Sequence, residues 1–449
     1  MDIESWRSSS RTIEKSQRYY VHFDYPTDIS KCWDYISDPL NIVKHSFYPF
    51  IHYKKKMRKF SKIKGRKNKI REICYAAHID RCIFQYYNFL LNTSYNEKCQ
   101  QLNIDDAAIA YRTNMPAMTN IQFAKRAFDF IRNSDHCFIM IGDYTKFFDN
   151  LDHLYLKKQW CFLLETPRLS ADHYAVFKNI TRYSYVERAD ILTIYGLENT
   201  AKGQRELNRK RRIFAPGELK QHKKLIKKSL AFGIPQGSPM SGVLANIYML
   251  EVDKTLYDLA ASFDDLYMRY SDDFIFILPQ VPENIALEKL KEVKSLFDNT
   301  RFPGLILEAD KTQYYHFSGE TINNIGKKVF DDSDCSNRYL NFLGFTFNGK
   351  MISIRDKTVS KFYYRVRRKA KTIAQSGGRT KKGKQISSRN LYMKYSIRGA
   401  YSENGNFLSY VHRAEDEFKN EAVGLINQRH MRQIRKFLKR DYPKKKKGR

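Results

Sequence analysis

The sequence predicts an α+β fold in which a sheet-containing middle is followed by a basic, helical C-terminal region. Between residues 73 and 354, short apolar runs typical of strands alternate with longer stretches that carry apolar residues at helical spacing. From about residue 355 onward, the pattern indicates basic helices. Hydrophobic residues make up 42% of the 449-residue chain, which is enough for a substantial core.

The first half of the chain predicts helices around one strand. Residues 73–92, ICYAAHIDRCIFQYYNFLLN, have the spacing of a buried helix, and MTNIQFAKRAFDFIRN at 118–133 predicts another. HCFIMIGDYTKFF at 136–148 begins with a short apolar run, which predicts a strand that ends at Asp143. HLYLKKQWCFLLE at 153–165 predicts the helix that follows.

The second half of the mixed region has a less regular pattern. Residues 166–230 show no clear period, and we treat them as an insertion or variable segment. The remaining stretches predict a helix at 238–260, an apolar hairpin at 266–278, an amphipathic helix at 282–299, and strands at 304–317 and 338–354.

The formal net charge of +32 indicates a polyanionic partner, most often a nucleic acid and sometimes an anionic membrane. Residues 54–71 contain eleven Lys or Arg and no acid, residues 202–228 contain eleven more against Glu206 and Glu218, and residues 357–402 contain fourteen and no acid. The chain ends in the basic tail KKKKGR. We expect these runs to line one groove that follows phosphates, although a solvated basic surface is the alternative.

The seven cysteines form no CxxC pair, so the sequence suggests neither a zinc ribbon nor a disulfide framework. The N-terminus lacks an apolar signal segment, and no apolar run approaches the ~18 residues of a membrane span. We therefore expect a cytoplasmic protein without a membrane partner.

The stretch LYMRYSDDFIFIL places Asp272 and Asp273 at a turn between two apolar runs. Buried carboxylates are costly unless a cation neutralises them. Asp143 lies at the end of another apolar strand, so a neighbouring strand could bring the three carboxylates together. Such a cluster predicts a pair of Mg²⁺ ions that serve in-line phosphoryl transfer, with Mn²⁺ as an alternative ion. Each aspartate taken alone could instead be a turn or cap residue.

These residues belong to five motifs that resemble those of reverse transcriptases. YSDD at 270–273 resembles their YxDD signature, and GDYTKFFDNLDH at 142–153 resembles their first aspartate block. FGIPQGSPMSGVLANIYM at 232–249, LEADKT at 307–312 and FLGF at 342–345 are similar to the PQG, lysine and primer-grip blocks, in the family's order. A looser similarity at 76–91 and 108–114 points to bacterial abortive-infection and defence-associated reverse transcriptases, which are related to group II intron enzymes.

The resemblance implies a right-hand polymerase with an RRM-like antiparallel palm sheet and an all-α basic thumb. An N-terminal extension and the fingers would occupy residues 1–135, the palm residues 136–355 with the insertion at about 166–230, and the thumb residues 356–449. The activity implied is RNA-directed DNA polymerisation from dNTPs, with a noncoding RNA as template and a DNA product in antiviral defence. Homo-oligomerisation is left open.

The resemblance also assigns roles to individual residues. Metal ligands would be Asp143, Asp272 and Asp273 together with the Tyr144 carbonyl, while Lys311 would protonate the leaving pyrophosphate or pair with its charge. Phe148 would be a steric gate against the ribose 2′-hydroxyl. The nucleotide would also contact Gln236, Gly237, Arg112 and Arg81, although each arginine could equally be a structural ion-pair partner. Template and primer would contact Pro235, Ser238, Tyr270, Leu343 and Gly344.

Two alternatives stay open at this point. The same palm could synthesise DNA without a template or from a protein primer, and no single tyrosine among the 31 can be chosen as that primer. A protein of another class, an RNA-binding or maturase-like protein with an idle palm, is disfavoured because Asp143, Asp272 and Asp273 are all present.

Overall fold

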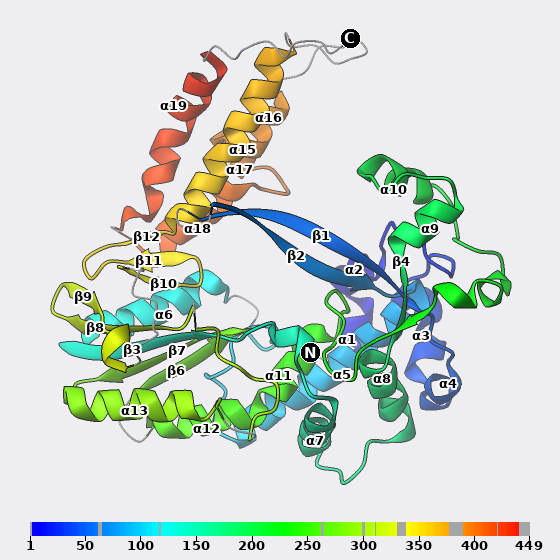
Figure 1. Ribbon diagram of the computed structural model, residues 1–449, viewed down its shortest axis with the longest axis horizontal. Helices are drawn as coiled ribbons and strands as arrows, with labels where there is room; N and C mark the ends of the chain where they lie inside the picture. The colour runs from blue at the N-terminus through cyan, green and yellow to red at the C-terminus, as the bar shows by residue number, and fades with distance from the viewer. Residues whose placement is uncertain are drawn as a thin grey trace.

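A five-stranded antiparallel sheet forms the centre of the structure, a computed structural model that describes residues 2–61, 65–115, 118–261, 265–298, 301–309, 311–329, 338–376, 389–419 and 421–439. The strand order is β6-β7-β3-β8-β9, so the hairpin β6–β7 lies directly beside β3 (Figure 1). The strands are β3 (His136–Asp143), β6 (Leu266–Tyr270), β7 (Asp273–Pro279), β8 (Gln313–Ser318) and β9 (Thr321–Asn324).

Alternating side chains give this sheet two buried faces. Phe138 and Met140 of β3 pack with α12 (Leu250–Ala261) and α13 (Glu283–Ser295) in one core cluster. Ile139 of the same strand packs on the other face with α6 (Asn120–Asn133). Helices thus cover both faces of the sheet (Figure 1).

A small meander and a group of helices extend the second of these cores. β10 (Leu340–Phe342), β11 (Phe345–Phe347) and β12 (Ile352–Ile354) form a three-stranded antiparallel sheet. The helices that follow are α15 (Asp356–Gln375), α16 (Arg389–Tyr395), α17 (Ile397–Ala400), α18 (Phe407–Glu417) and α19 (Leu425–Lys439). Phe362, Val366 and Ala370 form the buried face of α15, which leaves its basic residues on the outside, and α15 and α19 stand side by side above the meander (Figure 1).

The N-terminal body is built around a second sheet of order β2-β1-β4-β5. β1 (Phe50–Ser61) and β2 (Gly65–Tyr75) form a long antiparallel hairpin that arches toward the foot of α15 (Figure 1). β4 (Ser184–Glu187) pairs in parallel with β1, and β5 (Lys227–Lys228) pairs with β4. The segment 166–230, which the sequence leaves unassigned, therefore completes the N-terminal sheet although it is inserted between strands of the central sheet.

The other helices mostly surround this body or connect it to the central sheet. They are α1 (Ile3–Ser8), α2 (Ser10–Ser16), α3 (Ile29–Ser37), α4 (Pro39–Lys44), α5 (His78–Gln101), α7 (His153–Leu163), α8 (Ala171–Thr181), α9 (Arg188–Ile194), α10 (Ala201–Leu207), α11 (Ser241–Tyr248) and α14 (Gly326–Val329), with 3-10 turns η1 (Phe147–Asp149), η2 (Glu218–Lys220), η3 (Lys223–Leu225) and η4 (Ala422–Gly424). In the described part of the chain, none of the helices combines the length and the apolar character needed to cross a membrane.

Several expected elements are corrected by the structure. The helix predicted from residue 73 begins at His78, because Ile73–Tyr75 belong to β2. The basic run 54–71 forms most of the hairpin β1–β2, and the strand predicted from residue 304 begins only at Gln313. Of the predicted basic runs, residues 62–64 and 377–388 and the tail 444–449 lie outside the described residues.

Candidate active site

Asp143 and Asp273 face each other across the centre of the main sheet. Asp143 is the last residue of β3 and Asp273 the first of β7, and the antiparallel register pairs them directly. Directly opposed residues have side chains about 5 Å apart at Cβ, and like charges in that position repel. The strand ends thus hold two carboxylates close together, as the apolar patterns of both strands predict.

Asp272 reaches the same region through the turn of the β6–β7 hairpin. Tyr270 pairs with Asp273, so Ser271 and Asp272 form a two-residue turn between them. Ser271 has φ +63°, in the left-handed region that side chains rarely adopt.

A buried ion pair fixes the turn from beneath. Arg269 is fully buried, and it donates to both carboxylate oxygens of Asp253 at 2.8 and 2.6 Å. Its Nη1 also donates to the Ser271 carbonyl at 2.9 Å, so α12 is connected directly to the β6–β7 turn. Burial alone lowers the pKa of Arg269, but the Asp253 carboxylate outweighs it and raises that pKa above its ordinary value.

Lys311 supplies a positive charge at this cluster. Its Nζ lies 2.5 Å from Asp143 Oδ1 and 3.7 Å from Glu308 Oε2. Burial lowers the pKa of Lys311, but the hydrogen bond and charge of Asp143 outweigh it, and the net pKa is raised. Burial, followed by the charges of Asp272 and Asp143, raises the pKa of Asp273 to about 7.

These residues fit a divalent cation chemically. The donors are carboxylates on rigid strands, the type of ligand that Mg²⁺ takes together with substrate phosphates. The Lys311 ammonium forms an ion pair with Asp143, so this carboxylate already binds one positive charge. Two backbone hydrogen bonds join the chain around Tyr144 to the segment 306–308: Glu308 N–H donates to the Asp143 carbonyl, and Thr145 N–H donates to the Ile306 carbonyl. The Tyr144 carbonyl takes part in neither bond. Among the described residues, no group of three or more His, Cys, Asp or Glu is already arranged as a metal site.

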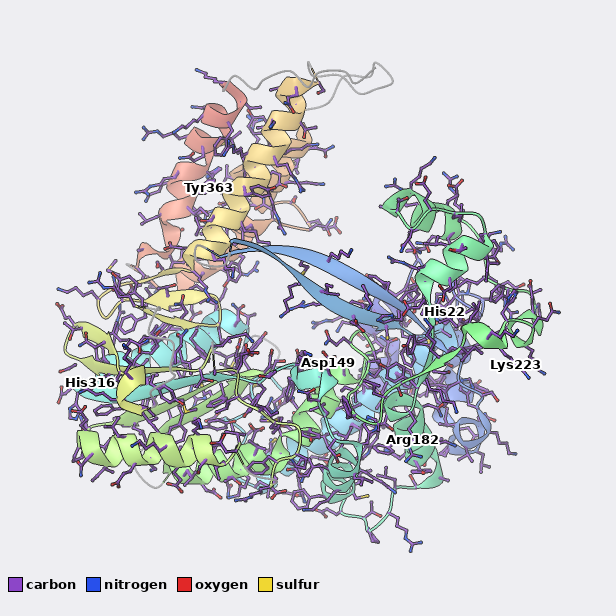
Figure 2. The ribbon with its side chains drawn as sticks, viewed as in Figure 1. His22, Asp149, Arg182, Lys223, His316 and Tyr363 are labelled. Atoms are coloured by element: carbon purple, nitrogen blue, oxygen red, sulfur yellow. The ribbon has the colours of Figure 1, made fainter. Side chains whose placement is uncertain are left out.

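Phe148 and the PQG segment lie against each other beside the aspartates. Phe148 is half-buried in the turn η1, and its carbonyl accepts a hydrogen bond of 2.9 Å from Ile234 N–H. Gln236 Nε2 donates to Asp149 Oδ1 at 3.0 Å. Figure 2 labels Asp149 between the central sheet and the N-terminal body. Gly237 has φ +118°, and a Cβ there would lie 2.4 Å from the Cys74 carbonyl oxygen of β2. Glycine is therefore required here by contact with the protein's own hairpin.

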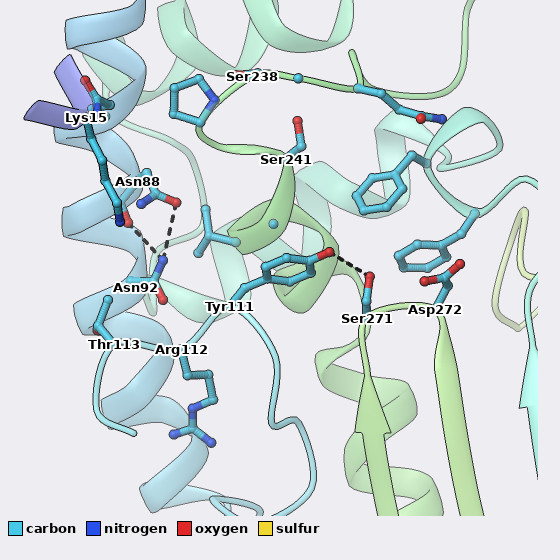
Figure 3. Close-up of a pocket in the computed structure, with 18 of the residues that line it drawn as sticks. Lys15, Asn88, Asn92, Tyr111, Arg112, Thr113, Ser238, Ser241, Ser271 and Asp272 are labelled. Atoms are coloured by element: carbon cyan, nitrogen blue, oxygen red, sulfur yellow. Dashed lines mark hydrogen bonds between the residues drawn. The ribbon is translucent and has the colours of Figure 1, made fainter. Parts of the chain in front are cut away.

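One large cavity, of about 2520 Å³, unites most of these groups. Among the residues that line it are Asp143, Tyr144, Phe148, Gln236, Gly237, Ser238, Asp272, Asp273, Lys311, Arg81 and Arg112. The cavity extends from the central sheet to α5 and the N-terminal helices, and Figure 3 shows part of it. In the described part of the chain, the lining of the cavity does not include Pro235, Tyr270, Leu343 or Gly344.

The two predicted arginines have different surroundings. The Arg112 side chain is fully buried and bonds to Asp105, Asn96 Oδ1 at 3.0 Å and the Ala108 carbonyl at 3.3 Å. These contacts match the alternative in which Arg112 is a structural ion-pair partner. Arg81 does not pair with its neighbour Asp80, which binds His45 Nε2 at 2.8 Å. Arg81 instead donates to the Lys15 carbonyl.

The FLGF motif is the tight turn between β10 and β11. Leu343 and Gly344 have φ values of +46° and +95°. Asn120 of α6 donates to the Leu343 carbonyl at 2.9 Å, and the Gly344 carbonyl accepts from Arg355 N–H at 3.0 Å. Tyr270 is half-buried at the end of β6, and the Pro235 carbonyl accepts from Ser241 Oγ at 2.7 Å.

Sequence reasoning missed Tyr111 and the role of Arg269. The Tyr111 hydroxyl lies 2.9 Å from Ser271 Oγ, and the side chain is 48% exposed in the cavity (Figure 3). Nothing in the local pattern marks Tyr111, whose φ of +63° is visible only in the structure. Arg269 did carry a signal, because a charge inside the apolar strand LYMRY needs a buried partner.

Comparison with known proteins agrees with the sequence motifs. A family model described as "Reverse transcriptase (RNA-dependent DNA polymerase)" matches residues 54–347, which is more than half of the chain. No curated protein matches.

The solved structures that are similar to this chain include telomerases of two Candida species. Apo telomerase from Candida tropicalis truncated from the C-terminal domain has 14% identity and a TM-score of 0.35, covering 67% of this chain and 55% of its own. Telomerase from Candida albicans in complex with a TWJ fragment of telomeric RNA has 14% identity and a TM-score of 0.39, covering 91% and 60%. Apo telomerase from Candida tropicalis has 13% identity and a TM-score of 0.39, covering 87% and 68%. This chain thus spans 55% and 60% of the length of the first two.

Proposed function

The chain belongs to the reverse transcriptase (RNA-dependent DNA polymerase) family, and we propose that it extends DNA with dNTPs on an RNA template by two-metal phosphoryl transfer. The observation that carries this proposal is the opposition of Asp143 and Asp273 on adjacent strands, with Asp272 in the adjoining turn. Clustered carboxylates at the wall of a large basic-lined cavity suit a triphosphate substrate and its cations.

The proposed roles follow from the positions of the side chains. Asp143, Asp272 and Asp273, with the Tyr144 carbonyl, would hold Mg²⁺ or Mn²⁺, which when bound activates the attacking oxygen and stabilises the leaving one. Lys311 is a charged donor beside Asp143 and can release its proton to the departing pyrophosphate or pair with its charge. Phe148, half-buried in the cavity wall, can exclude a 2′-hydroxyl from the sugar position.

The test of this function is synthesis by purified protein with Mg²⁺ and labelled dNTPs, with and without an RNA template. Templated product is expected from the wild type. Asp272→Ala with Asp273→Ala should abolish synthesis, because two carboxylates of the cluster are removed, while RNA binding measured by filter retention should persist. Normal incorporation by this double variant would contradict the assignment, and template-free product would favour untemplated or protein-primed synthesis.

For the biological role, we propose an antiviral defence enzyme that copies an associated noncoding RNA. The proposal is supported by the resemblance of residues 76–91 and 108–114 to defence-associated reverse transcriptases. RNA and DNA that copurify with the protein should be sequenced. A single structured RNA together with its complementary DNA is expected, whereas a random sample of cellular RNA would contradict the role.

A further inference from the structure

A stripe of polar side chains follows one face of α5 along the cavity. Arg81, Gln85, Asn88, Asn92 and Asn96 all line the cavity, and their spacing of three or four residues keeps them on one face of the helix. The opposite face of α5 is apolar and packs into the core, as Ile83 and Tyr87 do.

Three more cations face the same part of the cavity from the N-terminal segment. Arg11 and Lys15 lie on α2, and Arg18 follows that helix. Burial and the charges of Arg11 and Arg18 lower the pKa of Lys15, so these cations repel one another. In the described part of the chain, no carboxylate forms an ion pair with any of the three or with Arg81. Among the described residues, the cluster therefore has no ion-paired counter-anion.

Three buried side-chain atoms of this stripe have no hydrogen-bond partner among the described residues. Arg81 is 7% exposed, and its Nη1 has no hydrogen-bond partner. Asn92 is 2% exposed, and its Oδ1 has no partner although its Nδ2 donates to Asn88 (Figure 3). Gln85 Oε1 is likewise unpaired. A buried donor without an acceptor and buried acceptors without a donor indicate a ligand that offers both.

We propose that this face, made of the α5 stripe and the α2 cations, binds single-stranded RNA. The phosphates pair with Lys15, Arg18 and Arg81, and ribose 2′-hydroxyl groups donate to the amide oxygens of Gln85 and Asn92. DNA offers the same phosphates but lacks the 2′-hydroxyl donor. The inference rests on the proposed function only in taking this RNA to be the template strand that leads toward Asp143.

The experiment measures binding alone, by fluorescence anisotropy in the absence of dNTPs. The probes are a fluorescein-labelled 12-nucleotide RNA and the DNA of the same sequence. Wild-type protein should prefer the RNA, and Gln85→Ala with Asn92→Ala should weaken RNA binding about three- to tenfold, since hydrogen bonds are lost. DNA binding by this amide variant should stay within about twofold of the wild type.

A second variant tests the cations. Lys15→Gln with Arg18→Gln changes two exposed side chains and should weaken both probes, lowering the slope of log K against log salt by about 1.4. Lys158→Gln with Lys291→Gln makes the same charge change outside the cavity and should leave the slope nearly unchanged. Equal loss of RNA and DNA by the amide variant, or no loss by either variant, would overturn the inference. Binding as expected without any synthesis would instead contradict the proposed function alone.

Discussion

At the scale of single residues, the ion pair of Asp143 with Lys311 connects the proposed metal ligand with the residue proposed to meet the leaving pyrophosphate. One oxygen of Asp143 lies 2.5 Å from Lys311 Nζ, so the residue that would hold a cation is balanced by the residue that would meet the leaving group. Glu308 also contacts this lysine, at 3.7 Å, and its backbone bonds to the Asp143 carbonyl. The segment after residue 305 thus positions the lysine without being a regular strand.

Phe148 gives a prediction about substrate choice. Phe148→Ala should raise incorporation of ribonucleotides relative to deoxyribonucleotides by roughly tenfold or more, because the ring no longer excludes a 2′-hydroxyl. The measurement is the ratio of kcat/KM for a ribonucleotide and its deoxy counterpart. Phe162→Ala, on α7 and outside the cavity, is the matched control and should leave the ratio unchanged. An unchanged ratio for Phe148→Ala would mean that this ring only packs.

At the scale of elements, the hairpin β6–β7 depends on a buried ion pair beneath its turn. Arg269→Met removes the contact with the Ser271 carbonyl and leaves the Asp253 carboxylate buried without its partner. Breaking such a pair costs about 3–5 kcal/mol. We expect the denaturant midpoint of Arg269→Met to fall sharply and its primer-extension rate to fall with it.

A double variant separates stability from positioning. Arg269→Met with Asp253→Asn removes the unpaired charge, while the Asn oxygen can still accept from the Tyr267 hydroxyl. The midpoint should recover much of its loss, whereas single-turnover extension should stay slow because the Ser271 carbonyl remains unanchored. A fully wild-type extension rate in the double variant would show that the arginine does not position the turn.

The contact between the PQG segment and the hairpin β1–β2 gives a further prediction. Gly237→Ala adds a Cβ that would lie 2.4 Å from the Cys74 carbonyl oxygen, in addition to the strain of φ +118°. Gly217→Ala is the control, since φ is +83° but no atom lies within 4 Å. The control should lose about 1–2 kcal/mol. Gly237→Ala should lose clearly more in urea unfolding, and equal losses would mean that the loop can move away from β2.

The sequence predicted the central elements better than the peripheral ones. The strand that ends at Asp143 and the hairpin around Asp272 were predictable because continuous apolar runs show strands covered on both faces. The hairpin β1–β2 was not, since the charges of 54–71 conceal any alternation of apolar residues, and the parallel pairing of β4 with β1 joins residues more than 120 positions apart. The contact of Arg81 with the Lys15 carbonyl also joins residues far apart in the chain, whereas Arg112 binds the nearby Asp105, Asn96 and Ala108.

At the scale of the whole molecule, the net charge of +32 is concentrated on particular surfaces. On α15, Phe362, Val366 and Ala370 are buried in the core shared with the other C-terminal helices, while Lys361, Arg365 and Arg368 are exposed. One face of this helix is therefore apolar, and the outer face carries cations. No acidic residue lies between residues 357 and 376. This arrangement favours contact with phosphates along a nucleic-acid backbone.

The final prediction concerns the salt dependence that this array produces. Binding of an RNA–DNA hybrid should weaken steeply with salt, because each cation that neutralises a phosphate releases counterions. Lys361→Gln with Arg365→Gln and Arg368→Gln should lower the slope of log K against log salt by about 2 to 3, while the core behind Phe362 stays intact. Lys158→Gln with Arg168→Gln and Lys291→Gln removes the same charge from exposed positions on other elements. If the two triple variants lowered the slope equally, only net charge would matter, and α15 would have no specific place on the nucleic acid.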